Sequence, residues 1–365
     1  MKSDLTDKYL VSLNWLNSIG PATLKKLIKK LNSPEAVFKA SFFDLRKAGL
    51  EEKIIHNFIA ERQKIDPDKI IAYLAKENIQ VITLTDKNYP MLLKEIYAPP
   101  LALYYRGNAK LFNWQLNLAV VGSRKISTYS QMVMPKLLNP VITRGVNIIS
   151  GCALGVDTLA HQLALANNGQ TIAVIGSGLN WNCFYPQSNV NLAQEIIAKG
   201  GLIISEYPPH LKAQTFHFPL RNRIIAGLAN AVLIMEAAQK SGALLTAAYA
   251  LEQNREVLAV PQNINALNAA GVDNLIKNGA KVITSSNDIL EIFGLEPGQM
   301  EIELKLPNLS AEEIMIYKLL SSEPQHIDKI AENATLDTAI INASLMQLEL
   351  KGLVKNLGNQ CYLKL

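Results

Sequence analysis

The sequence predicts an α/β protein with a small helical N-terminal domain, a core built on a parallel sheet, and a C-terminal winged-helix-like domain. Two observations carry this prediction. Between residues 118 and 260, short apolar runs alternate with stretches of helical length, and apolar strands without polar alternation are typical of a sheet covered on both faces. After residue 310, three helical segments precede a hairpin, which is the order of a winged helix.

Residues 1–75 are expected to form the helical domain, of the SAM or helix-hairpin-helix-like kind. Apolar side chains recur at helical spacing after Gly20-Pro21, and proline suits a helix start because its missing N–H would have no partner there. The same helix carries Lys25, Lys26, Lys29 and Lys30. Two interpretations stay open: a Gly-Pro hairpin that seats a DNA phosphate, or a small bundle with a solvated lysine face.

Residues 76–296 are predicted to form an extended Rossmann-like domain with right-handed crossovers. Its strands are expected at 79–83, 101–105, 118–121, 146–149, 171–175, 202–204, 231–235 and 257–260, with helices that include 157–166 and 244–253. A linker at 297–309, which overlaps the turn-rich segment 294–307, leads to the domain at 310–365. That domain should contain helices at 310–320, 327–333 and 338–351 and a hairpin at 353–364 that turns at Gly358-Asn359.

Composition excludes several classes of protein. The scattered Cys152, Cys183 and Cys361 show no CxxC spacing, so neither a disulfide framework nor a zinc site is predicted. No apolar run reaches the roughly 20 residues of a membrane span, and the N-terminus lacks the apolar core of a signal peptide. We therefore expect a cytoplasmic protein that has no membrane contact, metal or cofactor. The formal net charge of +5 is only mildly basic.

Several turns of the core have the composition of anion sites. Strand ends followed by helix N-termini present free backbone N–H groups, and the helix dipole favours negative charge there. Such turns are Gly122-Ser123-Arg124, Ser150-Gly151 and Lys240-Ser241-Gly242, the last with Thr246 one turn on. A row of these turns fits the row of phosphates in a polymer. The alternative for Arg124 is a structural pairing with a carboxylate.

The segment from Phe216 to Arg223 interleaves aromatic and basic side chains. Aromatic faces stack bases while guanidinium groups bind phosphates, which is the usual economy of single-strand binding. Alternatively, Phe216 and Phe218 are core anchors and one of Arg221 and Arg223 is a structural clamp.

Three further features give weaker signals. Gly176-Ser177-Gly178 resembles half of a dinucleotide fingerprint but lacks its third glycine. His161 on a predicted helix is expected to be a core residue rather than a base. Glu236, at a strand end, is either a catalytic carboxylate or a structural acid, and the absence of a paired acid favours the second.

The motifs GSR, SGxAxGxDxxAH, TIAVxGxG, SEY, FPxRNRIIAGL, EAxxKSGxLxTAxxAL and AVP occur in this order. In these motifs the chain resembles the DNA-processing protein A (DprA, or Smf) family over essentially its whole length. The resemblance implies a non-enzymatic protein that binds single-stranded DNA, forms a homodimer through its Rossmann domain, and helps to load RecA recombinase on incoming DNA in natural transformation. The implied DNA- and phosphate-binding residues are Gly122, Ser123, Arg124, Ser150, Gly151, Lys212, Phe218, Arg221, Asn222, Arg223, Lys240, Ser241, Gly242 and Thr246.

Some positions depart from the family pattern, which commonly has glycine at Ser130, a basic residue at Leu154, and Pro-Gly where Pro261-Gln262 stands. A basic residue is also common at Thr215, and Lys212 and His217 are candidates to compensate. The alternative function is a Rossmann-like nucleotide phosphoribohydrolase. Such enzymes carry a PGGxGTxxE signature, whereas the turn at 240–246 has neither the double glycine nor a glutamate at its end.

The C-terminal domain lacks the charge of a DNA reader. Residues 310–365 contain five lysines against seven acidic residues, a net charge of −2. The last predicted helix, 338–351, is the one that would enter a major groove, yet its only basic residue is Lys351. Because phosphate contacts dominate DNA affinity, we predict that this domain docks a protein surface.

Overall fold

The computed structural model describes residues 7–16, 18–296, 309–321, 324–334, 336–358 and 360–364. The chain divides into two compact units, Met1–Pro297 and Gly298–Leu365. The predicted linker lies almost entirely outside the described residues. None of the described helices is long and apolar enough to cross a membrane.

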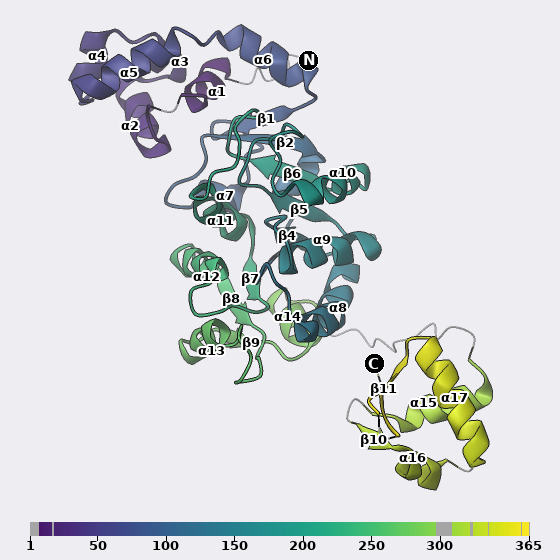
Figure 1. Ribbon diagram of the computed structural model, residues 1–365. Coiled ribbons are helices and arrows are strands. Elements are labelled where there is room, and N and C mark those ends of the chain that lie inside the picture. Colours follow the sequence, from purple (N-terminus) through teal and green to yellow (C-terminus); the bar gives the residue numbers. More distant parts are fainter. Residues whose placement is uncertain are drawn as a thin grey trace. The chain divides into compact units, whose positions relative to one another are not determined.

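The first unit is built on one large, mostly parallel sheet (Figure 1). Its strands are β1 (Gln80–Thr83), β2 (Ala102–Gly107), β3 (Asn117–Val121), β4 (Asn147–Ser150), β5 (Thr171–Val174), β6 (Leu202–Ser205), β7 (Ala231–Ile234), β8 (Glu256–Ala259) and β9 (Lys281–Val282). Their spatial order is β1-β2-β6-β5-β4-β3-β7-β8-β9. Strand β2 runs antiparallel to both β1 and β6, and all other pairs are parallel. The predicted fold class is confirmed.

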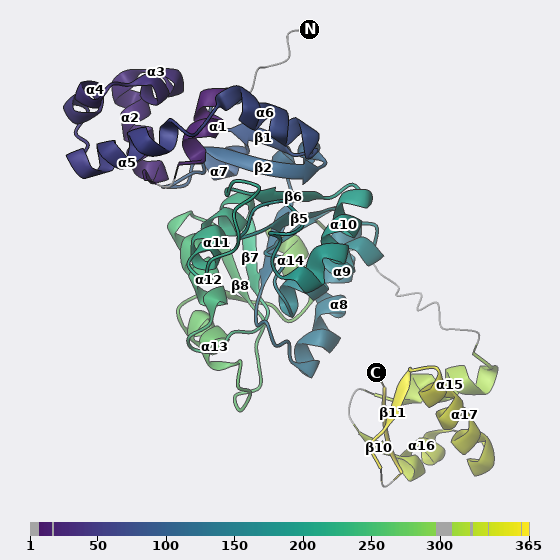
Figure 2. The same ribbon diagram turned by 45° about the horizontal axis from the view of Figure 1, so that its top comes forward.

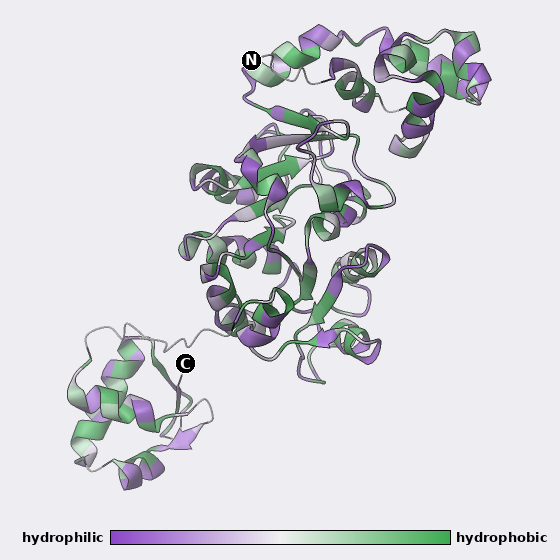
Figure 3. Cartoon of the chain, turned by 180° about the vertical axis from the view of Figure 1, so that it is seen from behind, coloured by the Kyte–Doolittle hydropathy of each residue, from purple (hydrophilic) through white to green (hydrophobic). Residues whose placement is uncertain are grey.

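Helices cover both faces of this sheet (Figures 1 and 2). One face packs against α7 (Met91–Lys94), α11 (His217–Leu228), α12 (Gly242–Glu252) and α13 (Ala270–Lys277). The other packs against α8 (Thr128–Thr143), α9 (Val156–Ala166), α10 (Val190–Ala198) and α14 (Ser286–Ile292). The central strands are buried along their whole length, and they are mostly green in Figure 3. Burial on both faces explains why their sequences read as continuous apolar runs.

Among the described residues, six helices precede the sheet: α1 (Lys8–Asn14), α2 (Pro21–Leu31), α3 (Pro34–Lys39), α4 (Phe42–Lys47), α5 (Glu52–Arg62) and α6 (Pro67–Lys76). Helix α2 starts at Pro21, as predicted, and its four lysines are exposed. Most of these helices share a core of their own. Helices α1 and α6 also contribute Val11, Ile70 and Leu74 to a cluster that continues under β2, so the sheet and the helical segment pack together.

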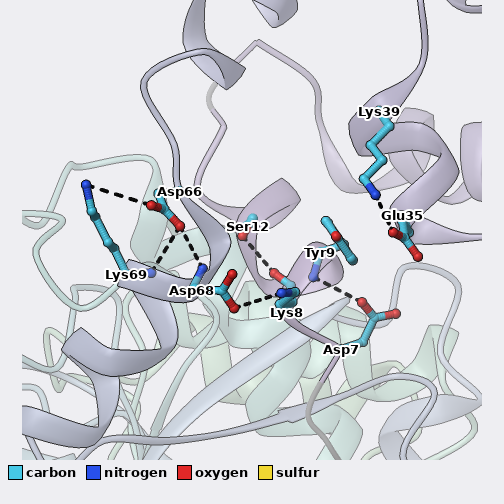
Figure 4. A network of polar contacts seen from close by, with 9 residues as sticks. All are labelled: Asp7, Lys8, Tyr9, Ser12, Glu35, Lys39, Asp66, Asp68 and Lys69. Carbon is cyan, nitrogen blue, oxygen red and sulfur yellow. Dashed lines mark hydrogen bonds and ion pairs between the residues drawn. The ribbon is translucent and has the colours of Figure 1, made fainter.

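A surface network of polar contacts links α1, α3 and α6 (Figure 4). The Asp7 and Asp66 carboxylates cap α1 and α6 by accepting hydrogen bonds from backbone N–H groups in the first turn of each helix. Lys8 Nζ lies 2.7 Å from Asp68 Oδ1. Exposed ion pairs of this kind each contribute only about 0–1 kcal/mol, so the apolar clusters hold these helices in place.

The second unit is a winged helix, as predicted. It contains α15 (Ala311–Leu319), β10 (Gln325–His326), α16 (Ile327–Asn333), α17 (Thr338–Leu350), β11 (Val354–Asn356) and β12 (Cys361–Lys364), with its strands in the order β10-β12-β11. Ile341, Leu345 and Leu348 of α17 are buried in its core. Asn359 of the predicted hairpin turn lies outside the described residues.

Candidate nucleic-acid interface

The topology creates a crevice beside β3. The chain passes from β3 through β4 and β5 to β6 and then returns to β7 on the other side of β3. In open α/β sheets, ligands bind at such a switch point, outside the carboxyl ends of the strands. A cavity of about 520 Å³ lies there. Its lining includes Gly122, Ser123, Arg124, Ala153, Asp157, Tyr185, Thr215, Phe218, Arg221, Asn222, Ser241, Gly242, Thr246 and Asn268.

An exposed cation and two aromatic rings lie together in this cavity. The Arg124 guanidinium carbon lies 5.4 Å from the centroid of the Phe218 ring. The Tyr185 ring lies a further 5.4 Å from Phe218, at an interplanar angle of 47°. Arg124 is exposed and Tyr185 is 47% exposed, so both can reach a ligand. A guanidinium beside ring faces is suited to bind a phosphate while a base stacks.

Helix N-termini supply the second component of the site. Helix α12 begins at Gly242, and the hydroxyl of its cap, Ser241, accepts from the Ala243 N–H at 3.3 Å. Helix α9 begins after Gly155, whose φ of +78° and close approach to Ser123 O exclude a side chain. Positive dipole ends at the rim of the cavity favour a negatively charged ligand.

Arg221 lies on the floor of the cavity and is turned inward. It is only 4% exposed, and its NH1 donates to Gly151 O at 2.7 Å and to Val174 O. Buried Asp157 lies close by and accepts from the N–H groups of Gly151 and Ala153. Burial raises the pKa of Asp157, and the positive charge of Arg221 opposes that shift. The arginine therefore holds the loop after β4 in place.

Arg223 is also paired within the protein. Its guanidinium forms an ion pair with Glu206, and both side chains are nearly buried. Burial raises the pKa of Glu206, while the charge of Arg223 and its hydrogen bond act in the opposite direction. Arg223 does not line the cavity. The sequence left open that one of these two arginines is a structural clamp. In the structure, both Arg221 and Arg223 bind acceptors within the protein.

The structure brings most of the predicted site residues together. Those that line the cavity are Gly122, Ser123, Arg124, Phe218, Arg221, Asn222, Ser241, Gly242 and Thr246. Ser150 and Gly151 lie behind it, where Ser150 Oγ donates to Val120 O at 2.7 Å. A Cβ at Gly151 would lie 2.5 Å from Arg221 NH2. Lys212, Arg223 and Lys240 are not part of the lining, although both lysines are exposed.

His217 does not replace the missing charge near Thr215. It is buried, its ring is stacked on Tyr207 at 3.9 Å, and its Nδ1 lies 3.1 Å from Gly176 O. Burial lowers the pKa of His217, so the ring is neutral at pH 7. Positive charge on the cavity wall therefore comes chiefly from Arg124.

The three weaker sequence signals are structural. His161 is fully buried, with Nδ1 2.7 Å from Thr171 Oγ1. A Cβ at Gly176 would lie 2.9 Å from the Phe218 ring, so that glycine makes room for the aromatic side chain. Glu236 is fully buried and accepts from Ser127 and from Ser130 Oγ, the latter at 2.7 Å. Ser130, which departs from the family pattern, thus donates a hydrogen bond to the buried carboxylate of Glu236.

Sequence reasoning missed Tyr185 and Asn268, because neither belongs to a recognisable turn motif. It also did not predict that the Arg221 side chain points into the protein, although the spacing of its neighbours indicates this. Arg221 shares a helical face with Ile224, Ile225 and Leu228, and that spacing marks the buried side of α11. Among the described residues, no group of three or more His, Cys, Asp or Glu side chains could hold a metal ion.

The fold and the cavity define a Rossmann-like protein with a crevice at the switch point of its sheet, lined by an exposed arginine and helix N-termini. Residues 80–294 match the family model "DNA recombination-mediator protein A", and residues 303–360 match the "DprA winged helix domain". The chain belongs to the DNA recombination-mediator protein A family, which confirms the resemblance drawn from its motifs.

Individual relatives agree with this assignment. The chain is 35% identical to Protein Smf of Synechocystis sp., over 95% of this chain and 96% of that protein. The crystal structure of DNA processing protein A from Streptococcus pneumoniae is 34% identical, with a TM-score of 0.65 over 80% of this chain and 97% of the other. DNA processing protein A from Helicobacter pylori, whose structure concerns a single-stranded DNA binding mode, is 31% identical, with a TM-score of 0.53 over 59% and 95%.

Proposed function

We propose that this protein is a non-enzymatic recombination mediator that binds single-stranded DNA and helps to load RecA on incoming DNA in natural transformation. One observation carries the proposal: the exposed guanidinium of Arg124 lies over Phe218 in an open cavity at the strand ends. The family membership and the single-stranded DNA binding of the Helicobacter pylori relative support it.

The aromatic rings favour a single strand over a duplex. A base can stack on Phe218 or Tyr185 only when it is free of its neighbours, and single strands offer such bases without a cost of unpairing. The contacts that the cavity offers, guanidinium, helix N-termini and ring faces, carry no base-specific pattern. We therefore expect binding that is strongly salt-dependent and weakly sequence-dependent.

The contacts of the acidic residues around the cavity support a non-enzymatic role. Glu236 is enclosed by hydrogen-bond donors, and Asp157 is buried against backbone N–H groups. Neither is an exposed carboxylate poised beside a ligand, as a general acid or base must be. The turn at 240–246 also lacks the double glycine and the final glutamate of the phosphoribohydrolase signature.

The test is a titration of single-stranded and duplex DNA over a range of salt concentrations, with a nucleotide-hydrolysis assay alongside. Arg124→Ala should weaken single-strand binding whatever the base sequence. Arg144→Ala is the matched control, because Arg144 is exposed at the opposite end of the sheet. Equal wild-type affinity for duplex and single strand would contradict the proposal, and nucleoside monophosphate cleavage would favour the hydrolase.

Self-association is the second part of the proposal. Ile264 and Leu267 are 88% and 94% exposed in the loop before α13. Exposed apolar side chains that gather in this way are typical of an interface between subunits. We expect a homodimer through this face, which would align the cavities of the two subunits along one DNA strand. Light scattering at tens of micromolar should report a dimer for the wild type and a monomer for Leu267→Asp.

RecA loading has its own assay. RecA filament formation on DNA that is already coated with single-strand binding protein should be accelerated by the wild type. Arg124→Ala, which should fold normally but bind single-stranded DNA weakly, should not accelerate filament formation. An equal acceleration by both proteins would separate RecA loading from this cavity.

A further inference from the structure

A second groove lies on the opposite face of the sheet from α11 and α12. It has a volume of about 360 Å³ and is lined by Asn78, Gln80, Arg106, Gly107, Trp181, Gln194 and Ile197. These residues come from the end of α6, from β1 and β2, from the loop after β5, and from α10. Figures 1 and 2 show α10 beside the β2 and β6 edge of the sheet, with α6 next to β1 and β2.

The groove contains an arginine, Arg106, whose Nε donor has no acceptor among the described residues. The Arg106 guanidinium carbon lies 5.2 Å from the centroid of the Trp181 ring. Its Nε is buried and has no hydrogen-bond partner within the described part of the chain, and no carboxylate described there forms an ion pair with it. Glu77 acts on it only at longer range. A buried donor without a partner costs about 1–3 kcal/mol, so a bound acceptor would relieve this cost.

The groove is connected to the switch-point cavity by a single loop. Trp181 lies in the groove and Tyr185 lines the cavity, and three residues of chain, or four Cα–Cα steps, separate them. A chain segment of that length spans at most about 14 Å. A polymer that occupies the cavity can therefore reach the groove within a few nucleotides.

We propose that Arg106 and Trp181 form a second subsite for single-stranded DNA, in which Arg106 binds a phosphate and Trp181 stacks a base. The pairing of a guanidinium with an aromatic ring repeats the chemistry of Arg124 and Phe218 in the cavity. The amides of Asn78, Gln80 and Gln194 can bond base edges or sugar oxygens. The inference rests on the proposed single-strand binding and extends its path over the sheet.

The first measurement is tryptophan fluorescence of the full-length protein, titrated with oligothymidylates of about 4 and about 16 nucleotides. The chain has three tryptophans. Stacking on Trp181 should quench the fluorescence of the wild type with the longer strand, and Trp181→Phe should remove that quenching while the protein still binds. Unchanged quenching in Trp181→Phe would overturn the proposal.

The second measurement is affinity as a function of salt. Arg106→Ala should weaken binding of the longer strand about fivefold or more. It should also lower the salt slope, which is the magnitude of the slope of log K against log salt concentration, by about 0.7, the value for one single-strand phosphate. Because this variant could also disturb packing, Gln194 gives an independent pair of variants on the exposed face of α10. Gln194→Lys should strengthen binding and Gln194→Glu should weaken it.

Matched controls are Gln115→Lys and Gln115→Glu, exposed ahead of β3 and away from the groove lining. Equal effects at Gln115 and Gln194 would overturn the proposal, since the charge would then act non-specifically. If Arg124→Ala weakens binding while every groove variant binds normally, only this inference fails. If the wild type does not bind single strands at all, the proposed function fails with it.

Discussion

The two arginines of the cavity, Arg124 and Arg221, should respond differently to the same substitution. Arg124 is exposed over Phe218, so Arg124→Ala should leave the fold intact and lower the salt slope of strand binding by about 0.7. Arg221 is buried, and its donors are taken by the carbonyls of Gly151 and Val174. Its removal leaves those carbonyls and the nearby buried Asp157 without their compensating charge.

The expected cost of Arg221→Ala follows from that burial. Removing one member of a buried charged pair typically destabilises a protein by about 3–5 kcal/mol. For a domain of this size, about 2 °C of melting temperature is lost per kcal/mol, so Tm should fall by about 6–10 °C. Strand affinity should also fall, because the loop at 151–155 loses its anchor, but the salt slope of the folded fraction should stay close to that of the wild type.

Thermal unfolding and a salt titration of the two variants side by side test this difference. Arg221→Lys is the informative companion, since it keeps a charge but cannot reach both carbonyls, and it should be destabilised to a smaller extent. The reasoning is refuted if Arg221→Ala melts at the temperature of the wild type and shows the same loss of salt slope as Arg124→Ala. Arg221 would then be a phosphate ligand.

Three other predictions follow from the same contacts. Burial lowers the pKa of His161 to about 3, well below its unfolded value, so unfolding at acidic pH takes up a proton. The free energy of unfolding should therefore fall by about 2 kcal/mol between pH 7.5 and 5, and urea unfolding of His161→Gln should depend less steeply on pH. Thr215→Lys, which adds a cation to the cavity lining, should raise strand affinity and the salt slope, whereas Gln115→Lys should change neither. Deletion of residues 310–365 should leave single-strand affinity within about threefold, and micromolar duplex binding by that domain would contradict its assignment as a protein-docking module.

The exposed face of α17 fits that last prediction. Ile340, Met346 and Leu350 are 43%, 63% and 72% exposed, and Ala343 is exposed between them. A helix that reads a major groove is usually supplied with several basic and amide side chains, whereas α17 exposes the amides of Asn342 and Gln347 and has no basic residue before Lys351. The apolar face supports a protein partner for the domain.

Much of the core could be predicted from local sequence because its signals are local. The strands from β3 to β8 begin and end within about a residue or two of their predicted bounds, since burial on both faces requires a continuous apolar run. Helix α8 was not among the helices given bounds from the sequence: Pro135 and Pro140 lie inside it, and proline normally argues against a helix interior. Packing of Leu137, Leu138 and Val141 against the sheet outweighs that local penalty.

The sequence by itself determined the fold class, the order of the glycine-containing turns at the strand ends and the residue types that meet at the switch point. Only the tertiary structure decided the direction of each side chain, turning Arg124 outward over Phe218 and both Arg221 and Arg223 inward to protein acceptors. It also brought Tyr185 and Asn268 into the cavity from loops that carry no motif. The physical reason is that a residue's type fixes what it can bind, whereas its partners are fixed by the strands and helices that surround it, and those contacts join segments far apart in the chain.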